Sequence, residues 1–151
     1  MKPFPLLGLS IGTDICQITR IRRILTKTYG KRFVDRILTP EEKGTTEARL
    51  RLGRGDVAEQ AVFLAGRFAA KEAVFKAFSR ERRLTWHDVS VWKVDGRPVG
   101  LVRPLRGGNE GIKEGEREVE KGGGDEGEEE VLVSISHDGD YATAFCIACI
   151  R

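Results

Sequence analysis

The first half of the chain carries apolar residues at the spacing of amphipathic helices. The strongest pattern covers residues 57–78, where large apolar side chains recur every three, four or seven positions. These side chains are Leu64, Phe68, Phe75 and Phe78. Asp56 stands where a helix cap is expected, because a short side-chain oxygen there accepts hydrogen bonds from the first turn. We therefore predict a long helix over residues 57–78.

Shorter helices are predicted before this one. A buried strand over residues 7–11 leads into a turn, and Asp14 and Gly30 are the expected cap and stop of the helix that follows. A second helix covers residues 33–38. Thr39 then begins a third helix, with a proline next and a glutamate at the position that completes a capping box. We expect this third helix to end at the glycines of residues 53–55.

From residue 88 onward the pattern changes to the alternation typical of strands. Apolar and polar residues alternate over residues 89–94, 131–135 and 141–147. Asp95-Gly96 predicts a hairpin turn, with a return strand over residues 99–102. Because helices come first and a mostly antiparallel sheet follows, the predicted fold class is α+β, with N-terminal helices packed on a small sheet.

The net charge of +3 conceals two regions of opposite sign. Residues 107–130 hold ten acidic and three basic residues together with eight glycines, a local charge of −7. The remaining 127 residues hold 23 basic and 13 acidic ones, a charge of +10. We predict a single domain over residues 1–151, interrupted at 107–130 by a disordered acidic insertion.

The composition also excludes several classes of protein. No apolar run approaches the roughly 20 residues of a membrane span, and the N-terminus lacks the features of a secretory signal. Three cysteines, an odd number, fit a reducing compartment better than a disulfide framework. We therefore predict an intracellular protein without a membrane partner.

Glu72 is the leading candidate for chemistry, because it lies beside the apolar stripe of the long helix and close to Lys71 and Lys76. One interpretation is a solvated ion pair between Glu72 and Lys76, one turn later. The other makes Glu72 a ligand for a hard cation and the lysines ligands for phosphate oxygens, the usual arrangement around Mg²⁺. Asp14, which by itself predicts only a helix cap, adds a second carboxylate, and Arg67 adds a further cation.

A second candidate cluster lies at the end of the strand over residues 131–135. Ser134 and Ser136 share one face of this strand, and His137 and Asp138 follow at its end. A hydroxyl, an imidazole and a carboxylate together suit anion binding or proton transfer. The alternative is that these residues only form a turn.

Two further motifs are expected to be structural. Residues 8–12 match a nucleophile elbow, but the chain is too short for the parallel sheet that this motif requires. Cys146 and Cys149 match a CxxC motif, but an offset of three places their thiols on opposite faces of a strand.

Three segments, in this order, resemble a known family. They are GTDI at residues 12–15, FLAGRFAAKEA at residues 63–73 and SISHD at residues 134–138. Together they resemble the signatures of holo-[acyl-carrier-protein] synthases, the small 4′-phosphopantetheinyl transferases, over most of residues 7–103 and 131–151. The resemblance implies transfer of 4′-phosphopantetheine from coenzyme A (CoA) to a serine of an apo acyl carrier protein, with release of adenosine 3′,5′-bisphosphate.

The resemblance also implies a role for each candidate residue. Asp14 and Glu72 match the carboxylates that hold Mg²⁺ against the CoA pyrophosphate. The positions that bind CoA and its phosphates correspond to Arg67, Lys71, Lys76, Ser136 and His137. Arg20, with Arg23 three residues later, matches the surface that contacts the carrier protein. In catalysis, Lys76 would offset charge on the pyrophosphate, and the proton acceptor is Glu72, His137 or Asp138.

The chain departs from the family pattern in two places. Residues 79–83, Ser-Arg-Glu-Arg-Arg, replace the Gly-Thr-Gly turn of many members, and the insertion at 107–130 has no counterpart in compact bacterial members. Because the insertion resembles eukaryotic stand-alone forms, the mitochondrial matrix is an expected location beside the cytoplasm. The bacterial members imply a homotrimer with active sites between subunits.

Two other functions stay open at the level of sequence. The charge of +10 outside residues 107–130 and the arginine-rich residues 20–23 and 80–83 fit a nucleic-acid-binding module, although the sequence lacks interleaved aromatic residues on which bases could stack. The other is a non-catalytic domain that binds CoA or carrier protein, against which the intact Asp14, Glu72 and Lys76 argue. We expect a transferase with no nucleic-acid partner.

Overall fold

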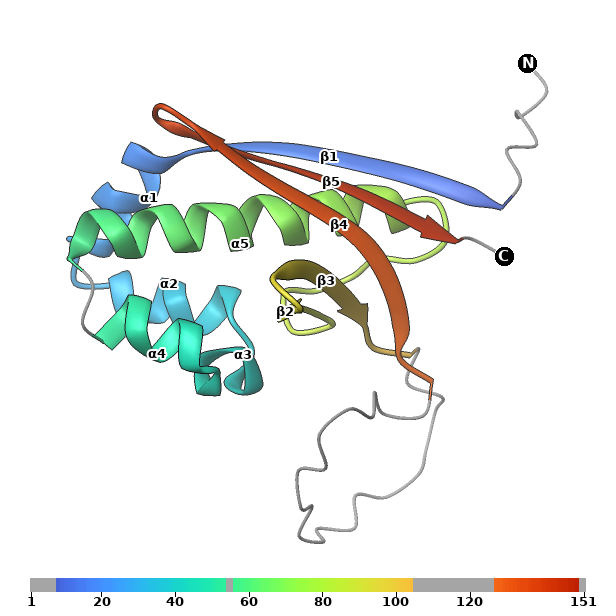
Figure 1. The fold of residues 1–151 in the computed structure, drawn as a ribbon, viewed down its shortest axis with the longest axis horizontal. Helices are drawn as coiled ribbons and strands as arrows, with labels where there is room; N and C mark the ends of the chain where they lie inside the picture. Colours follow the sequence, from blue (N-terminus) through green and yellow to red (C-terminus); the bar gives the residue numbers. More distant parts are fainter. Residues whose placement is uncertain (1–7, 54–55, 105–126, 150–151) are drawn as a thin grey trace, which may run out of the picture.

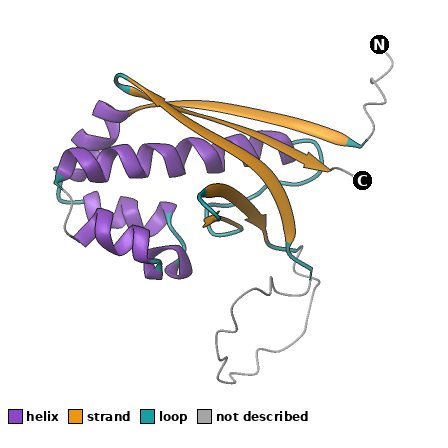
Figure 2. Cartoon of the chain, viewed as in Figure 1, coloured by secondary structure: helices purple, strands orange, loops and turns teal. Residues whose placement is uncertain are grey.

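The computed structural model describes residues 8–53, 56–104 and 127–149 (Figure 1). The strands are β1 (Leu9–Gln17), β2 (Val89–Val94), β3 (Arg97–Val102), β4 (Glu129–Asp138) and β5 (Tyr141–Cys149). The helices are α1 (Ile18–Leu25), α2 (Gly30–Ile37), α3 (Pro40–Gly44), α4 (Thr46–Gly53) and α5 (Val57–Phe78). Helices and one antiparallel sheet form separate layers, which confirms the predicted α+β class (Figure 2).

The long helix α5 lies between strands β1, β4 and β5 on one side and the short helices α2–α4 on the other, and the β2–β3 hairpin lies on the side of these helices (Figure 1). The sheet has the order β1-β5-β4-β3-β2, and all neighbouring strands are antiparallel. The contact between α5 and β1 is very close, because a Cβ added to Gly12 would fall 1.8 Å from the Ala73 carbonyl oxygen. Ser10 and Asp14 flank Gly12 on the same face of β1, so this approach brings both side chains against α5.

The face that α5 turns to the sheet differs from the predicted stripe. Leu64 and Phe78 are buried as expected. Much of the buried face, however, consists of alanines, whose small side chains permit the close approach. They are Ala65, Ala69, Ala73 and Ala77. Phe68 and Phe75 are only half-buried and pack on Trp86, with ring centroids 5.0 Å apart in each pair.

Two predicted helix boundaries before α5 are wrong. Asp14 is not a helix cap, because it lies inside β1, and α1 begins only at Ile18. Gly30 does not end α1 but is the first residue of α2. The third predicted helix divides into α3 and α4, because the backbone at Thr45 is extended.

The predicted caps and the predicted hairpin are confirmed. The Thr39 hydroxyl accepts a hydrogen bond of 3.1 Å from the Glu42 backbone N–H, and the Glu42 carboxylate accepts one of 2.8 Å from the Thr39 N–H. The Asp56 side chain accepts a hydrogen bond from the backbone of Glu59 at the start of α5. Asp95 and Gly96 have φ values of 49° and 79°, the left-handed conformation that a tight hairpin turn requires.

The face of the sheet opposite α5 is partly apolar and exposed in the described chain. Ile11, Ile15 and Leu132 are 68%, 64% and 67% exposed, and Phe145 is 50% exposed. The register places Ile11 and Leu132 on either side of Ile147, so these side chains form one patch. Singly exposed apolar residues are ordinary, but a contiguous group is typical of an interface.

The two cysteines of the CxxC motif lie on opposite faces of β5, as predicted. Cys146 is buried, and this burial raises the pKa of its thiol to about 12. Cys149 is exposed. Cys146 therefore belongs to the core, as predicted, whereas Cys149 does not.

Residues 107–126 of the predicted insertion lie outside the described residues. The predicted insertion extends too far at its C-terminal end, residue 130, because Glu129 and Glu130 belong to β4 and pair with Val102 and Leu101. Among the residues that the structure describes, no helix is both long and apolar enough to cross a membrane.

Candidate functional site

Asp14 and Lys76 meet where β1 crosses the C-terminal half of α5. The Lys76 ammonium lies 2.8 Å from the Asp14 carboxylate and also donates a 2.8 Å hydrogen bond to the Thr13 carbonyl oxygen. The Lys76 side chain is 52% exposed, while that of Asp14 is 15% exposed. The carboxylate is thus held in place, and the ammonium remains accessible to a ligand.

Glu72 lies one turn before Lys76 and belongs to the same cluster. Partial burial raises the pKa of its carboxyl, and the negative charge of Asp14 raises it further, against the opposing effects of Lys76 and Arg20. Two neighbouring carboxylates also attract a divalent cation. Among the described residues no group of three or more metal-binding side chains occurs. Two carboxylates alone fit Mg²⁺, which usually takes one or two from the protein and completes its shell with water and phosphate.

Arg20 connects this cluster to α1. Its guanidinium lies 5.3 Å from the centre of the Phe68 ring and donates a weak hydrogen bond of 3.7 Å to the Cys16 sulfur. It is also near enough to Glu72 to lower the pKa of that carboxyl. Arg23, on the same helix, is exposed. The structure therefore places one predicted carrier-binding residue at the edge of the carboxylate cluster.

Lys71 does not belong to the site, although it directly precedes Glu72. Its side chain is fully buried, and its ammonium donates hydrogen bonds to the Glu42 carboxylate at 2.6 Å and to the Ile37 and Trp86 carbonyls at 2.7 and 3.1 Å. This ammonium has no path to a phosphate on the surface, so the contact expected from the resemblance is absent. The spacing of Lys71 from Leu64 and Phe78, seven residues each way, is the signal that placed it on the buried face.

Arg67 and His137 lie together in a second region, a cleft of about 440 Å³ between α4, α5, the β2–β3 hairpin and β4. The Arg67 guanidinium lies 2.9 Å from the Glu47 carboxylate and 4.9 Å from the centre of the Phe63 ring, and burial lowers the pKa of Arg67. His137 Nε2 is 3.3 Å from the Val62 carbonyl oxygen.

Gly66 leaves the space that His137 occupies. A Cβ at this position would lie 3.0 Å from His137 Nε2, closer than ordinary van der Waals contact. Arg51 and Lys93 also line the cleft and were not identified from the sequence. No local motif marks these two residues, because they come from α4 and β2 and meet only in the tertiary structure.

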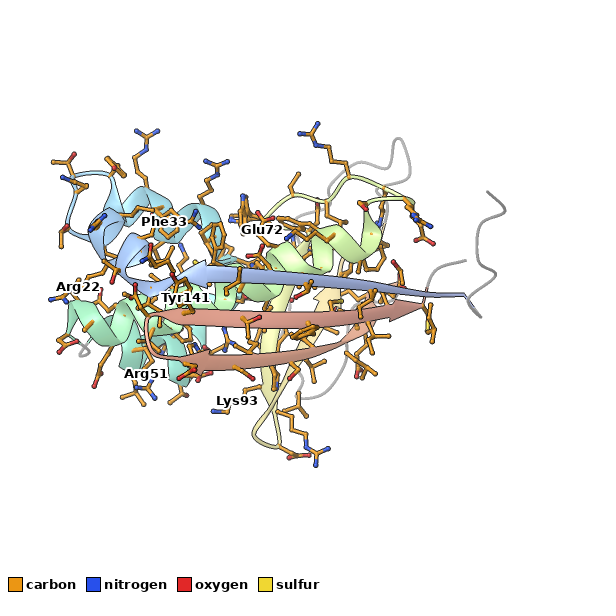
Figure 3. The ribbon with its side chains drawn as sticks, turned by 90° about the horizontal axis from the view of Figure 1, so that it is seen from above. Arg22, Phe33, Arg51, Glu72, Lys93 and Tyr141 are labelled. Carbon is orange, nitrogen blue, oxygen red and sulfur yellow. The ribbon has the colours of Figure 1, made fainter. Side chains whose placement is uncertain are left out.

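The two regions lie on opposite sides of α5. Figure 3 shows Glu72 on one side of the helix and Arg51 and Lys93 on the other. Helical geometry agrees, since Phe63 and Glu72 are nine residues apart, which is two and a half turns. A single chain therefore does not bring the Asp14 cluster and the His137 cleft into one pocket.

Strand alternation also separates Ser136 and Asp138 from His137. Ser136 pairs with Thr143 and Asp138 with Tyr141, on the outer face of the sheet. His137 pairs with Ala142, whose side chain is buried on the α5 side. The hydroxyl, imidazole and carboxylate predicted to cluster at this strand end do not converge within one chain.

Comparisons with known proteins agree with the resemblance seen in the sequence. A family model described as the 4′-phosphopantetheinyl transferase superfamily matches residues 10–146. The chain is 35% identical to a holo-[acyl-carrier-protein] synthase of Wolbachia pipientis, over 93% of this chain and 94% of that protein. It is 37% identical to the mitochondrial 4′-phosphopantetheinyl transferase B of Aspergillus fumigatus, over 97% and 96% of the two chains.

The fold has a counterpart among solved structures. The structure of a holo-(acyl-carrier-protein) synthase from Bacillus anthracis, in complex with CoA (3′,5′-ADP), superimposes with a TM-score of 0.57. The sequence identity is 28%, and the match covers 94% of this chain and 96% of that one. Because the family model spans most of the chain and the relatives align along nearly their whole length, the chain belongs to the 4′-phosphopantetheinyl transferase superfamily.

Proposed function

We propose that the chain transfers 4′-phosphopantetheine from CoA to a serine hydroxyl of an apo acyl carrier protein and releases adenosine 3′,5′-bisphosphate. The observation that carries this proposal is the arrangement of Asp14, Glu72 and Lys76, two carboxylates and an accessible ammonium on adjoining elements. The names of the two relatives and the CoA complex of the solved structure support the same substrates.

The residues of the cluster have distinct tasks in this reaction. Asp14 and Glu72 would hold Mg²⁺, and that ion would neutralise negative charge on the pyrophosphate. The Lys76 ammonium exchanges its contact with Asp14 for a phosphate oxygen of CoA. The serine oxygen forms a bond to the phosphorus next to pantetheine, and the bond from that phosphorus to the leaving adenosine bisphosphate breaks.

The proton of the attacking hydroxyl needs an acceptor close to the same cluster. Glu72 is the candidate that lies in this cluster within a single chain, where it accepts the proton directly or through a metal-bound water. His137 and Asp138 are alternatives only if a second chain brings them near Glu72, because they lie away from it in their own chain.

We propose that the chain forms a homotrimer and that each complete site is built from two adjacent copies. The Asp14 cluster and the His137 cleft lie on opposite sides of α5, so an adjacent copy is needed for both to contact one CoA molecule (Figure 3). The exposed apolar patch around Ile147 offers a surface for such contacts. In this arrangement Arg67 and His137 of one copy bind CoA, while Asp14 and Glu72 come from the next copy.

The carrier protein is proposed to dock on α1. This helix exposes Arg20, Arg22 and Arg23, and carries no acidic residue in its first turn. Such a surface suits an acidic partner helix. Arg20 lies beside Glu72, so a carrier bound there presents its serine close to the carboxylate cluster.

The mitochondrial matrix is the compartment that the comparisons favour over the cytoplasm, because one relative of matching length is named as mitochondrial. The substrate of this chain would then be a mitochondrial acyl carrier protein. Localisation of the tagged full-length chain in cells tests this expectation.

The decisive experiment incubates the purified chain with CoA, Mg²⁺ and an apo carrier protein. Mass spectrometry is expected to show that the carrier gains one phosphopantetheine group, and that the gain disappears when Mg²⁺ is chelated. A carrier with its acceptor serine changed to alanine is the matched control. Absence of transfer to bacterial and mitochondrial carriers, together with salt-sensitive binding of RNA, would favour the nucleic-acid-binding function instead.

A further inference from the structure

The first turn of α1 is capped by a residue that lies 121 positions away in the sequence. The Asp140 carboxylate accepts a 2.9 Å hydrogen bond from the Thr19 backbone N–H and a 2.6 Å hydrogen bond from the Thr19 hydroxyl. The Asp140 carbonyl oxygen accepts a 2.8 Å hydrogen bond from the Ile18 N–H. One residue of the β4–β5 turn thus satisfies the first two amide groups of the helix.

The sheet register brings this turn to α1. Gln17, the last residue of β1, pairs with Tyr141, the first residue of β5, so Asp140 falls beside Ile18. Gly139 has a φ of 53° and allows the chain to reverse within two residues. The position of Asp140 is therefore determined by strand pairing and not by the sequence around α1.

Residues near α1 in the sequence supply no cap for its N-terminus. The residue before it, Gln17, makes no capping hydrogen bond with its side chain, and the first turn contains no acidic residue. The helix has eight residues, and helices this short are marginal without tertiary contacts. Ile21 is its only buried residue. A carboxylate at a helix N-terminus both accepts the free N–H groups and interacts favourably with the helix dipole.

We propose that Asp140 is a positioning residue for carrier-protein binding, because it fixes the start of α1 and through it the orientation of Arg20 and Arg23. This inference rests on the proposed function, in which α1 is the docking surface. The hydrogen bonds from Thr19 lower the pKa of Asp140, and the Arg23 charge contributes to that shift, so the carboxylate and Arg23 are neighbours.

Two substitutions separate capping from charge. Asp140→Ala removes the hydrogen-bond acceptor, whereas Asp140→Asn removes the charge and keeps an acceptor that caps helices about equally well. We expect Asp140→Ala to raise KM for the carrier protein about fivefold, with KM for CoA and kcat unchanged. Asp140→Asn should stay within about twofold of the natural chain.

Hydrogen exchange of the Ile18 and Thr19 amides supplies a readout that does not depend on activity. Asp140→Ala should accelerate the exchange of the Thr19 amide, whose acceptor it removes. The Ile18 amide, which donates to the Asp140 backbone carbonyl, and the α5 amides should stay unchanged, and Asp140→Asn should preserve protection throughout. An unchanged KM for the carrier in Asp140→Ala, or an equal rise in KM for CoA, would overturn the positioning role.

Failure of the proposed function gives a different result. If the natural chain transfers nothing to any carrier, the transferase proposal fails. Hydrogen exchange still tests whether Asp140 caps α1. Direct titration of apo carrier protein against the natural chain and against Asp140→Ala tests whether this cap affects carrier binding. Equal affinities in that titration would overturn the inference.

Discussion

Two lysines of α5, five residues apart, form ion pairs of nearly equal length and opposite consequence. Lys71 lies 2.6 Å from Glu42 with no solvent-accessible surface, whereas Lys76 lies 2.8 Å from Asp14 with half of its side chain exposed. A ligand would have to open the core to reach Lys71. It would displace only surface contacts to reach Lys76. The burial of an ion pair, and not its N–O distance, therefore decides whether the pair stabilises the fold or is available to bind a ligand.

Removing the two carboxylates of the site, Asp14 and Glu72, is expected to have the largest effect, and we expect that effect on activity. Asp14→Ala and Glu72→Ala should each reduce Mg²⁺-dependent transfer about a thousandfold or more, the scale of a lost charge-stabilising or proton-accepting group. The free energy of unfolding should change by no more than about 1 kcal/mol, because an accessible ion pair stabilises little. Rates come from the mass-spectrometric assay and stability from urea titration.

The control for this pair of variants is Asp35→Asn. Asp35 pairs with Lys43 at 2.7 Å, away from the cluster, and that variant should transfer at the rate of the natural chain. If Asp14→Ala or Glu72→Ala kept full rate, the corresponding carboxylate would have no role in metal binding.

Breaking the buried pair should instead reduce stability. Lys71→Met leaves the Glu42 carboxylate in the core without its cation, and loss of one partner of a buried pair typically costs about 3–5 kcal/mol. The double variant with Glu42→Gln should recover much of this loss, since no unpaired charge remains. Urea unfolding of the two variants measures both effects, and a stable Lys71→Met chain would contradict the structural role of the pair.

The pKa of Glu72 predicts a smaller effect that depends on pH. Burial and the Asp14 charge raise this pKa, so the folded chain binds the proton more tightly than the unfolded chain does. The resulting stabilisation is present below the unfolded pKa of about 4.3 and is lost as pH rises through the folded pKa. At pH near 7, Glu72→Gln should therefore be more stable than the natural chain, by less than about 1 kcal/mol.

This gain should vanish in acid. Urea midpoints at about pH 3 and pH 7 test this, since the first lies below and the second above the titration of an ordinary glutamate, whose pKa is about 4.3. A difference between Glu72→Gln and the natural chain that is the same at both pH values would show that the raised pKa has another origin.

The smallest effect is expected for the exposed pair of Lys43 and Asp35. The side chains are 34% and 46% exposed, and salt screens such pairs efficiently. Asp35→Asn should leave the midpoint of urea unfolding unchanged within error. A clear loss of stability in this variant would contradict the view that burial decides how much an ion pair stabilises the fold, on which the comparison of Lys71 and Lys76 depends.

Local patterns were sufficient for most of the secondary structure. The bounds of α5, the capping box of Thr39, the Asp56 cap and the Asp95-Gly96 turn were all predicted, because each depends on residues within four positions of one another. The start of α1 was mispredicted for the opposite reason. Asp14 has the local features of a cap, but strand pairing with β5 outweighs them and extends β1 by three residues beyond it.

The sequence by itself determined the family, the α+β class and the two carboxylates at the centre of the proposed site, because motifs and periodicity can be recognised along the chain without knowing how its segments pack. Only the tertiary structure decided that Lys71 points into the core, that α5 separates Glu72 from the cleft of His137, Arg51 and Lys93, and that Asp140 caps α1. These outcomes depend on which face of a helix or strand meets its neighbour. That choice is made by close contacts between distant segments, such as Gly12 against Ala73, which no local pattern contains.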